Sequence, residues 1–299
     1  MKVTIIGSVA FDSVETPFGK RENALGGSAT YASLSASFFS PVNLISVVGK
    51  DFPKKYFTMF KRREIDTAGL EQKKGKTFRW KAKYHYDLSY AETIYTHLNV
   101  FQGFKPAVPD NVSSKDNLLL ANIDPELQSW IFASIKPTGL VACDTMNLWI
   151  EHRKKALLKL LKKVDIFLLN DAEARQLSGE KNLIDAARYI ASKGTKMIVI
   201  KKGEHGALFF HGGLLFMVPA YLLEKICDPT GAGDTFAGGM LGYLSRKRRI
   251  TQTDLRRSLV YGSILASFVV EKFSVEGLLK TSVKDIDTRY RHFEKLTKF

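Results

Sequence analysis

Cysteine is scarce in this sequence: its 299 residues include only Cys143 and Cys227, and no Cys-x-x-Cys pair occurs. Disulfide-stapled domains and structural zinc sites need more cysteines at closer spacing, so the sequence excludes both classes. We expect the two cysteines to be small buried residues. Their scarcity favours a reducing compartment, and the cytoplasm is the expected location.

Long apolar runs are also absent. A membrane-spanning helix needs about 20 mostly apolar residues, and no stretch approaches that length. The first apolar stretch, residues 3–6, is too short for a signal peptide and is predicted to form a buried strand. We therefore expect no membrane partner.

Acidic residues are in deficit, because 45 Lys and Arg stand against 30 Asp and Glu, for a net charge of +15. Such a balance suits nucleic-acid binding, but no DNA- or RNA-binding motif accompanies it. The basic residues are widely spread, which suits a solvated surface that attracts nucleotides and phosphates. We expect no specific nucleic-acid partner. A non-catalytic, basic nucleic-acid or partner-binding protein is the alternative from another class.

Short apolar and β-branched runs alternate with helical patterns along most of the chain. The predicted strands span residues 42–48, 117–121, 139–143, 165–169, 196–200 and 207–210. The predicted helices lie near 126–135, 151–162, 171–178 and 182–193. This alternation indicates an α/β fold with a mostly parallel sheet covered by helices on both faces. Ligands of such sheets bind beyond the carboxyl ends of the strands, where Asn122, Asp144, Asn170 and Lys201 are expected.

Two segments interrupt this alternation, at about residues 11–25 and 73–101. Within the second, residues 77–86 alternate between apolar and polar side chains at period two. That period is typical of a strand with one face toward water or a ligand.

The most informative segment is Asp228-Pro229-Thr230-Gly231-Ala232-Gly233-Asp234, which leads into a predicted helix. Successive small residues allow backbone N–H groups to point together at an anion, and a helix N-terminus adds partial positive charge. A carboxylate beside such a site makes sense if the anion is a phosphoryl group in transfer. Asp234 would then accept the proton of the attacking hydroxyl, and Gly231, Ala232 and Gly233 would hold the developing charge.

A second glycine-rich segment lies near the N-terminus. Asp12 follows the first strand, and Gly26-Gly27-Ser28 opens a helix of small residues. A carboxylate can accept two hydrogen bonds from a vicinal diol, and a Gly-Gly pair allows a substrate to approach the backbone. We interpret Asp12, Gly26, Gly27 and Ser28 as the binding site for a polyhydroxylated acceptor.

Residues 228–239 resemble the second signature of the ribokinase-like (PfkB) family of carbohydrate and nucleoside kinases, and residues 7–12 with 26–31 resemble its first. The resemblance implies one three-layer α/β/α domain over residues 1–299. It also implies that the excursions at 11–25 and 73–101 form a small, discontinuous β lid, through which a homodimer could form. The family often has Asn after Gly-Gly or a few residues on, whereas the run here is Ser28-Ala29-Thr30-Tyr31. Gly-Gly-Ser is more similar to some adenosine kinases of the same family.

The resemblance extends to the nucleotide side of the site. Asn170 and Glu173 match an Asn-x-x-Glu motif that organises Mg²⁺ through water, although the same spacing is a helix-capping pattern. Lys201, Gly203 and Gly206 stand where the family has a Thr-x-Gly-x-x-Gly loop for the nucleotide, with Lys201 in place of Thr. Thr230 is a further nucleotide-binding candidate, and Asp228 is a candidate ligand of a monovalent cation, K⁺. Asp144 and Asn147 resemble a stretch near the phosphates.

These observations predict an ATP- and Mg²⁺-dependent kinase that transfers the γ-phosphoryl group to a hydroxyl of a sugar or sugar-containing acceptor. A nucleoside kinase of the same family is the alternative. Trp80, Tyr84 and Tyr86 could stack on a base and, if they share one face of a strand, should behave alike. A simple aromatic core of the lid explains the same residues.

Overall fold

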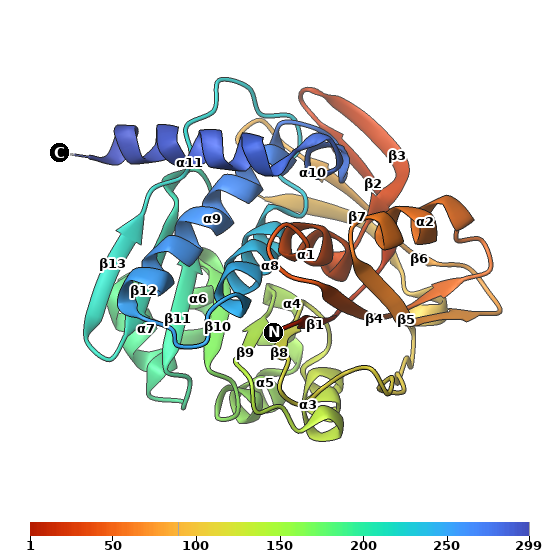
Figure 1. The fold of residues 1–299 in the computed structure, drawn as a ribbon, viewed down its shortest axis with the longest axis horizontal. Helices are drawn as coiled ribbons and strands as arrows, with labels where there is room; N and C mark the ends of the chain where they lie inside the picture. Colours follow the sequence, from red (N-terminus) through yellow and green to blue (C-terminus); the bar gives the residue numbers. More distant parts are fainter. Residues whose placement is uncertain (89, 299) are drawn as a thin grey trace.

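The computed structural model describes residues 1–88 and 90–298. Its centre is a nine-stranded sheet with the order β13-β12-β11-β10-β9-β8-β1-β4-β5 (Figure 1). The strands from β11 to β5 run parallel, whereas β12 and β13 are antiparallel to their neighbours. The bounds are β1 Val3–Ile6, β4 Val42–Gly49, β5 Ile65–Lys73, β8 Asn117–Leu120, β9 Val141–Asp144, β10 Ile166–Asn170, β11 Met197–Lys201, β12 Ala207–His211 and β13 Leu214–Val218.

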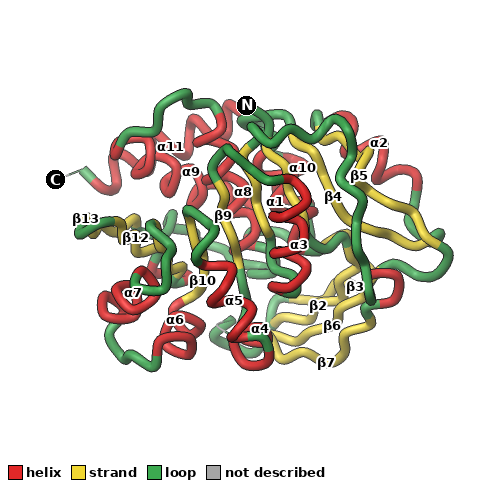
Figure 2. The backbone as a smooth tube through the Cα atoms, turned by 90° about the horizontal axis from the view of Figure 1, so that it is seen from below, coloured by secondary structure: helices red, strands yellow, loops and turns green. Residues whose placement is uncertain are grey.

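Helices cover both faces of this sheet (Figures 1 and 2), so the predicted three-layer fold is confirmed. One hydrophobic cluster joins the sheet to α1 (Ser28–Ala36), α2 (Lys54–Arg62), α8 (Ala232–Ser245), α9 (Gln252–Val270), α10 (Glu276–Lys280) and α11 (Val283–Thr297). A second cluster, on the other face, joins it to α3 (Pro125–Ile135), α4 (Asn147–His152), α5 (Lys154–Leu161), α6 (Asp171–Ser178) and α7 (Leu183–Ala191). No helix in the described ranges combines the length and apolarity needed to cross a membrane.

The central strands are buried on both faces, which explains their continuous apolar runs. In β1, Val3 and Ile5 pack in the first cluster, and Ile6 packs in the second. All four residues of β8 are buried as well. Parallel pairing of such strands brings their carboxyl ends to one edge of the sheet, and that edge carries the polar residues of interest.

A separate four-stranded sheet has the order β3-β2-β6-β7 and lies beyond this edge (Figure 2). Its strands are β2 Ala10–Thr16, β3 Gly19–Gly26, β6 Phe78–Tyr84 and β7 Ala91–His97. They come from the two segments that interrupt the α/β alternation. The strand expected over 77–86 is β6, and the small discontinuous β sheet is confirmed.

Helices α1 and α8 approach so closely that their contact excludes side chains. A Cβ atom added at Gly238 would overlap the carbonyl oxygen of Ala32, and one at Gly242 would lie 2.8 Å from Ala36 Cα. Two of the sequence's glycine-rich segments lead into these helices. Their close packing therefore fixes the distance between residues near 27 and residues near 231.

Two expectations are wrong. The helix predicted over 151–162 is divided into α4 and α5 at Arg153, which adopts φ −132° and ψ 23°. The Nε of Arg153 lies 3.4 Å from Oδ2 of Asp124, the N-cap residue of α3. Of the two cysteines, both free, Cys143 is buried as expected, but Cys227 is only partly buried.

Candidate active site

Three of the four polar residues expected at the strand ends lie at the carboxyl ends of three neighbouring strands, β9, β10 and β11. Asn170 pairs with Lys201 across β10 and β11, and Leu168 of β10 pairs with Asp144 of β9. Asn122 follows β8 by two residues, and its Oδ1 accepts a hydrogen bond from Trp149 Nε1 at 2.9 Å. The parallel register therefore gathers these side chains at one edge, as the sequence predicts.

The N-terminus of α8 forms a cradle of backbone N–H groups beside this edge. Gly231 precedes the helix with φ +77°, a left-handed conformation that glycine adopts without strain. Within the described residues, the N–H groups of Gly231 and Gly233 have no protein acceptor. The N–H of Ala232, which was expected to join them, bonds instead to Pro229 O at 3.1 Å and closes the turn before the helix. Unpaired first-turn amides of this kind bind anions.

Asp234 is in the first turn of the same helix. Its burial, together with the charge of Asp144, raises its pKa to about 7, against the opposing effect of the Lys201 ammonium. A carboxylate with a pKa near neutrality can both lose and accept a proton under ordinary conditions. A carboxylate that can exchange a proton near pH 7 therefore lies directly beside backbone N–H groups that have no protein acceptor in the described residues.

Asp12 and the Gly-Gly pair interlock. Asp12 Oδ2 accepts a hydrogen bond from the N–H of Gly27 at 3.3 Å, and a Cβ atom at Gly26 would overlap the same oxygen. Gly27 adopts φ +92°, and a Cβ atom there would lie 2.5 Å from Ser8 O. Both glycines are thus required by the packing around Asp12. Burial raises the pKa of Asp12 to about 7, although the Gly27 N–H lowers it.

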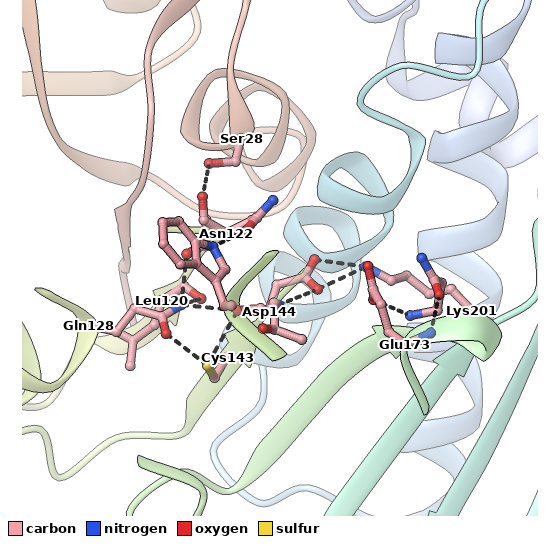
Figure 3. A network of polar contacts seen from close by, with 12 residues as sticks. Ser28, Leu120, Asn122, Gln128, Cys143, Asp144, Glu173 and Lys201 are labelled. Atoms are coloured by element: carbon pink, nitrogen blue, oxygen red, sulfur yellow. Dashed lines mark hydrogen bonds and ion pairs between the residues drawn. The ribbon is translucent and has the colours of Figure 1, made fainter. Parts of the chain in front are cut away.

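Ser28 uses its hydroxyl within the protein. Its Oγ accepts from the N–H of Ser8 at 3.2 Å and donates to the carbonyl oxygen of Asn122 at 3.4 Å (Figure 3). These bonds join the start of α1 to the ends of β1 and β8. A role for Ser28 in binding the acceptor stays a prediction.

Tyr31 is a site residue that the sequence analysis noted only as a departure from the family pattern. Its ring packs against the cradle, since a Cβ atom at Gly231 would lie 2.5 Å from three ring atoms. Its hydroxyl is buried and has no hydrogen-bond partner among the described residues. Burial raises the pKa of the Tyr31 phenol, and the negative charges of Asp12, Asp228 and Asp234 raise it further. The signal for this role that the sequence offered was the position of Tyr31, four residues after Gly27.

Asn170 and Glu173 form a capping box at the start of α6. Each backbone N–H donates to the other's side chain, at 2.7 Å in both cases. The N–H of Asn170 binds Glu173 Oε2, and no protein group binds Oε1 in the described part of the chain. Burial raises the pKa of Glu173 to about 7, although the Lys201 ammonium and the Asn170 N–H lower it. The capping interpretation is confirmed, and it leaves one carboxylate oxygen for a ligand.

Lys201 extends from the end of β11 toward the cradle. Its Nζ lies 2.8 Å from Asp144 Oδ2 and 3.0 Å from Asp144 Oδ1 (Figure 3). A Cβ atom at Gly233 would lie 3.1 Å from the same nitrogen. The sequence left open whether Lys201 faces solvent or the site, and the structure turns it inward.

The loop after Lys201 is tight. Gly203 begins a 3-10 turn with φ +55°, and Gly206 ends it with φ +86°. A Cβ atom at Gly206 would overlap Val218 O, whereas nothing lies within 4 Å of one at Gly203. Gly206 therefore has a packing reason of its own, and the nucleotide-binding role of both glycines stays a prediction.

The loop before the cradle is held by Asp228. Its Oδ1 accepts from the N–H of Thr230 at 2.9 Å, and its Oδ2 lies 3.5 Å from the N–H of Ser274. The hydroxyl of Thr230 contacts Tyr84 Oη at 3.3 Å, which joins this loop to the small sheet. Burial raises the pKa of Asp228 despite its hydrogen bonds.

The aromatic residues of the small sheet do not share one environment. Trp80 pairs with Asp12 across β6 and β2 and so lies on the same face, as does Tyr84 at period two. Tyr86 lies beyond the end of β6 and is 94% exposed, so the expectation that all three behave alike is wrong. His85 is also exposed and pairs with Glu92 at 2.9 Å.

Asp144 and Asn147 differ in setting. Asp144 ends β9 as a buried residue and accepts from the N–H of Thr145 at 2.9 Å, whereas Asn147 begins α4. The searched part of the chain, residues 1–88 and 90–298, holds no group of three or more His, Cys, Asp or Glu side chains arranged for a metal ion. A divalent ion here would need oxygens from water or a ligand besides protein.

Comparison with known proteins is consistent with this site. The family model described as pfkB family carbohydrate kinase matches residues 2–281. A cytidine kinase of Thermococcus kodakarensis is 29% identical over 84% of this chain and 91% of its own length. A ribokinase of Staphylococcus aureus is 26% identical over 92% of this chain and 95% of its own. The structure of a putative ribokinase II of E. coli with ATP and Mg²⁺ superimposes with a TM-score of 0.76, at 18% identity, over 97% of this chain and 99% of that one.

The raised pKa of Asp234 predicts that ligand-free stability falls as pH rises. In the unfolded chain this carboxyl loses its proton near pH 4, whereas in the folded protein it keeps it until about pH 7. The folded state thus binds more protons between these values, and its advantage disappears as pH rises through them. Asp234→Asn should therefore raise the Tm at pH 8 by roughly 2–6 °C and change it little at pH 4.

Differential scanning calorimetry at the two pH values measures this difference, and Asp110→Asn, at an exposed loop residue, is the control. A Tm for Asp234→Asn that shifts equally at pH 4 and pH 8 would contradict the assigned pKa.

Proposed function

The chain belongs to the pfkB family of carbohydrate kinases, and we propose that it transfers the γ-phosphoryl group of ATP to a hydroxyl of a sugar-bearing acceptor, with Asp234 as general base. The observation that carries this proposal is the position of Asp234 in the first turn of α8, directly after N–H groups that have no protein acceptor. A proton acceptor and an anion-binding cradle at one point are what phosphoryl transfer to an alcohol needs.

In the proposed step, the acceptor oxygen attacks the γ-phosphorus as its proton passes to Asp234. The bond between the γ-phosphorus and the oxygen bridging to the β-phosphate breaks. The electron pair of that bond stays on the bridging oxygen, which leaves as part of ADP. The unpaired N–H groups of Gly231 and Gly233 stabilise the charge on the moving phosphoryl group, whereas the N–H of Ala232 is bonded to Pro229 O. Asp12, on the small sheet, holds other hydroxyls of the acceptor. The small sheet serves as a lid that excludes water, a competing acceptor.

Mg²⁺ fits the nucleotide side of this site. Glu173 offers a carboxylate oxygen that no protein group binds in the described residues, and Asn170 positions it. Magnesium prefers oxygen ligands and keeps several waters, so a single water-linked carboxylate with donor phosphates suits it. The ion would neutralise phosphate charge. Asn170, Lys201, Gly203, Gly206 and Thr230 are the proposed contacts of the nucleotide.

Single substitutions of the two site carboxylates, Asp234 and Asp12, should separate their roles. Asp234→Asn keeps shape and hydrogen bonding but cannot take a proton at neutral pH, so kcat should fall by a factor on the order of 10²–10⁴ with donor affinity little changed. Asp12→Ala should instead raise the acceptor KM and leave the donor KM nearly constant. Steady-state kinetics of ADP release, after a screen of sugars and nucleosides, measures both. Near-normal turnover of Asp234→Asn with the true acceptor would refute the mechanism.

A nucleoside acceptor is the second candidate, and one observation favours it. Trp80 lies beside Asp12 on the same face of the small sheet, so an aromatic ring stands next to the proposed hydroxyl-binding carboxylate. A base attached to a ribose held by Asp12 could stack there. The 29% identical relative is a cytidine kinase, which is compatible with this acceptor class.

Trp80→Leu tests the nucleoside candidate. Loss of base stacking should raise the KM for a nucleoside by roughly 5- to 100-fold and leave the KM for the free sugar nearly unchanged. Tyr86→Leu is the matched control, because Tyr86 is an aromatic residue of the same segment with a fully exposed position. If Trp80→Leu changes both acceptors alike, the ring does not discriminate a base.

A monovalent cation beside Asp228 is a further part of the proposal. Asp228 is a buried carboxylate in the loop before the cradle, and no side-chain cation pairs with it in the described residues. K⁺ bound there would balance its charge. Activity in potassium should exceed activity in a bulky organic cation several-fold at equal ionic strength, and identical rates would remove the ion from the mechanism. A homodimer through the lid stays a prediction.

A further inference from the structure

The ammonium of Lys201 has binding capacity that the protein does not use. An ammonium has three N–H donors, and Asp144 is its only acceptor within residues 1–88 and 90–298. The side chain of Lys201 is 16% exposed, whereas that of Asp144 is 4% exposed. The carboxylate is therefore enclosed, and the lysine side chain is the more accessible partner of the pair.

The ammonium of Lys201 also adjoins the cradle. The Lys201 nitrogen would be 3.1 Å from a Cβ atom at Gly233, so it lies against the first turn of α8, where the N–H groups of Gly231 and Gly233 are unpaired. Two independent positive features, a side-chain cation and a helix N-terminus, thus converge on one volume. A group that satisfies both carries negative charge on several oxygens.

The charges around Lys201 point the same way. Its single positive charge faces the carboxylates of Asp144, Glu173 and Asp234, which affect its protonation from three different elements, β9, α6 and α8. A donor phosphate entering this region meets more negative than positive charge from side chains. Lys201 is the side-chain cation among these groups, so it is the group able to attract the donor directly.

We propose that Lys201 binds the terminal phosphoryl group of the donor, and that Asp144 holds the ammonium at the cradle until the donor arrives. The assignment rests on the proposed kinase function. The lysine stands where the family has threonine, and a flexible cation replaces a short hydroxyl there. Asp144 can give up the ammonium to the phosphoryl group because the N–H of Thr145 continues to donate to Asp144 Oδ1.

A purely structural ion pair between β9 and β11 makes a different prediction from this arrangement. If the pair only joins the strands, removing either partner leaves a buried charge alone and affects the protein in the same direction. If Asp144 competes with the phosphoryl group for Lys201, removal of the lysine weakens binding and removal of the carboxylate does not. Lys201→Met removes the attraction, and Asp144→Asn removes the competitor.

The test compares dissociation constants by titration calorimetry for the β,γ-imido analogue of ATP, ADP and adenosine, all with excess Mg²⁺. Lys201→Met should weaken the imido analogue about tenfold or more, ADP much less, and adenosine not at all. Asp144→Asn should leave the affinity for the imido analogue unchanged or raise it. Lys201→Arg should retain most of the affinity, and Lys201→Thr replaces Lys201→Met if the latter does not fold.

Equal weakening of the imido analogue by Lys201→Met and Asp144→Asn, or equal weakening of all three ligands by Lys201→Met, would overturn the assignment. So would an unchanged affinity in Lys201→Met. Failure of the kinase function is a separate result: the wild-type protein would neither bind the imido analogue nor release ADP with any acceptor.

Discussion

The close approach of α1 and α8 is the constraint on which the site depends. Gly238 and Gly242 bring the α8 backbone against Ala32 and Ala36, so close that a Cβ atom at either glycine would collide with the α1 backbone. Each helix begins in a glycine-rich turn, so this contact sets the spacing between the proposed acceptor-binding segment, residues 26–28, and the cradle. Phosphoryl transfer needs reacting groups at short, fixed separation, and here that separation is set by backbone packing instead of by mobile side chains.

The fold collects charge at the carboxyl edge of the sheet without stabilising it. Asp12, Glu173 and Asp234 all have pKa values raised to about 7, chiefly by burial. Buried carboxylates with raised pKa values lower the stability of the ligand-free protein at neutral pH. Such groups persist where they serve function, and strongly perturbed pKa values gather at active sites. The proposed Mg²⁺ and polyhydroxylated acceptor would supply the cation and the hydroxyl donors that these carboxylates need.

Much of the fold and site could be predicted because the information is local. A few consecutive residues are enough to predict three features: the parallel strands from their apolar runs, the helix start from the Gly-Ala-Gly step, and the capping box from Asn170 and Glu173. The break at Arg153 could not be predicted, because a helical pattern continues through it and Asp124 is distant in sequence. Likewise, the Lys201–Asp144 pair depends on register across three strands, and the exposure of Tyr86 depends on where β6 ends.

Tyr31 and Lys201, which both depart from the family pattern, lie against the same segment, Gly231-Ala232-Gly233. The ring of Tyr31 packs on Gly231, and the ammonium of Lys201 lies against Gly233, so the cradle is bordered by one departure at each end. Tyr31 belongs to the helix that follows the acceptor-binding segment, and Lys201 to the strand that leads into the nucleotide loop. Both carry polar atoms with unused hydrogen-bonding capacity. A change on either side would therefore act on the cradle directly, and the absence of side chains at Gly231 and Gly233 is what admits both neighbours.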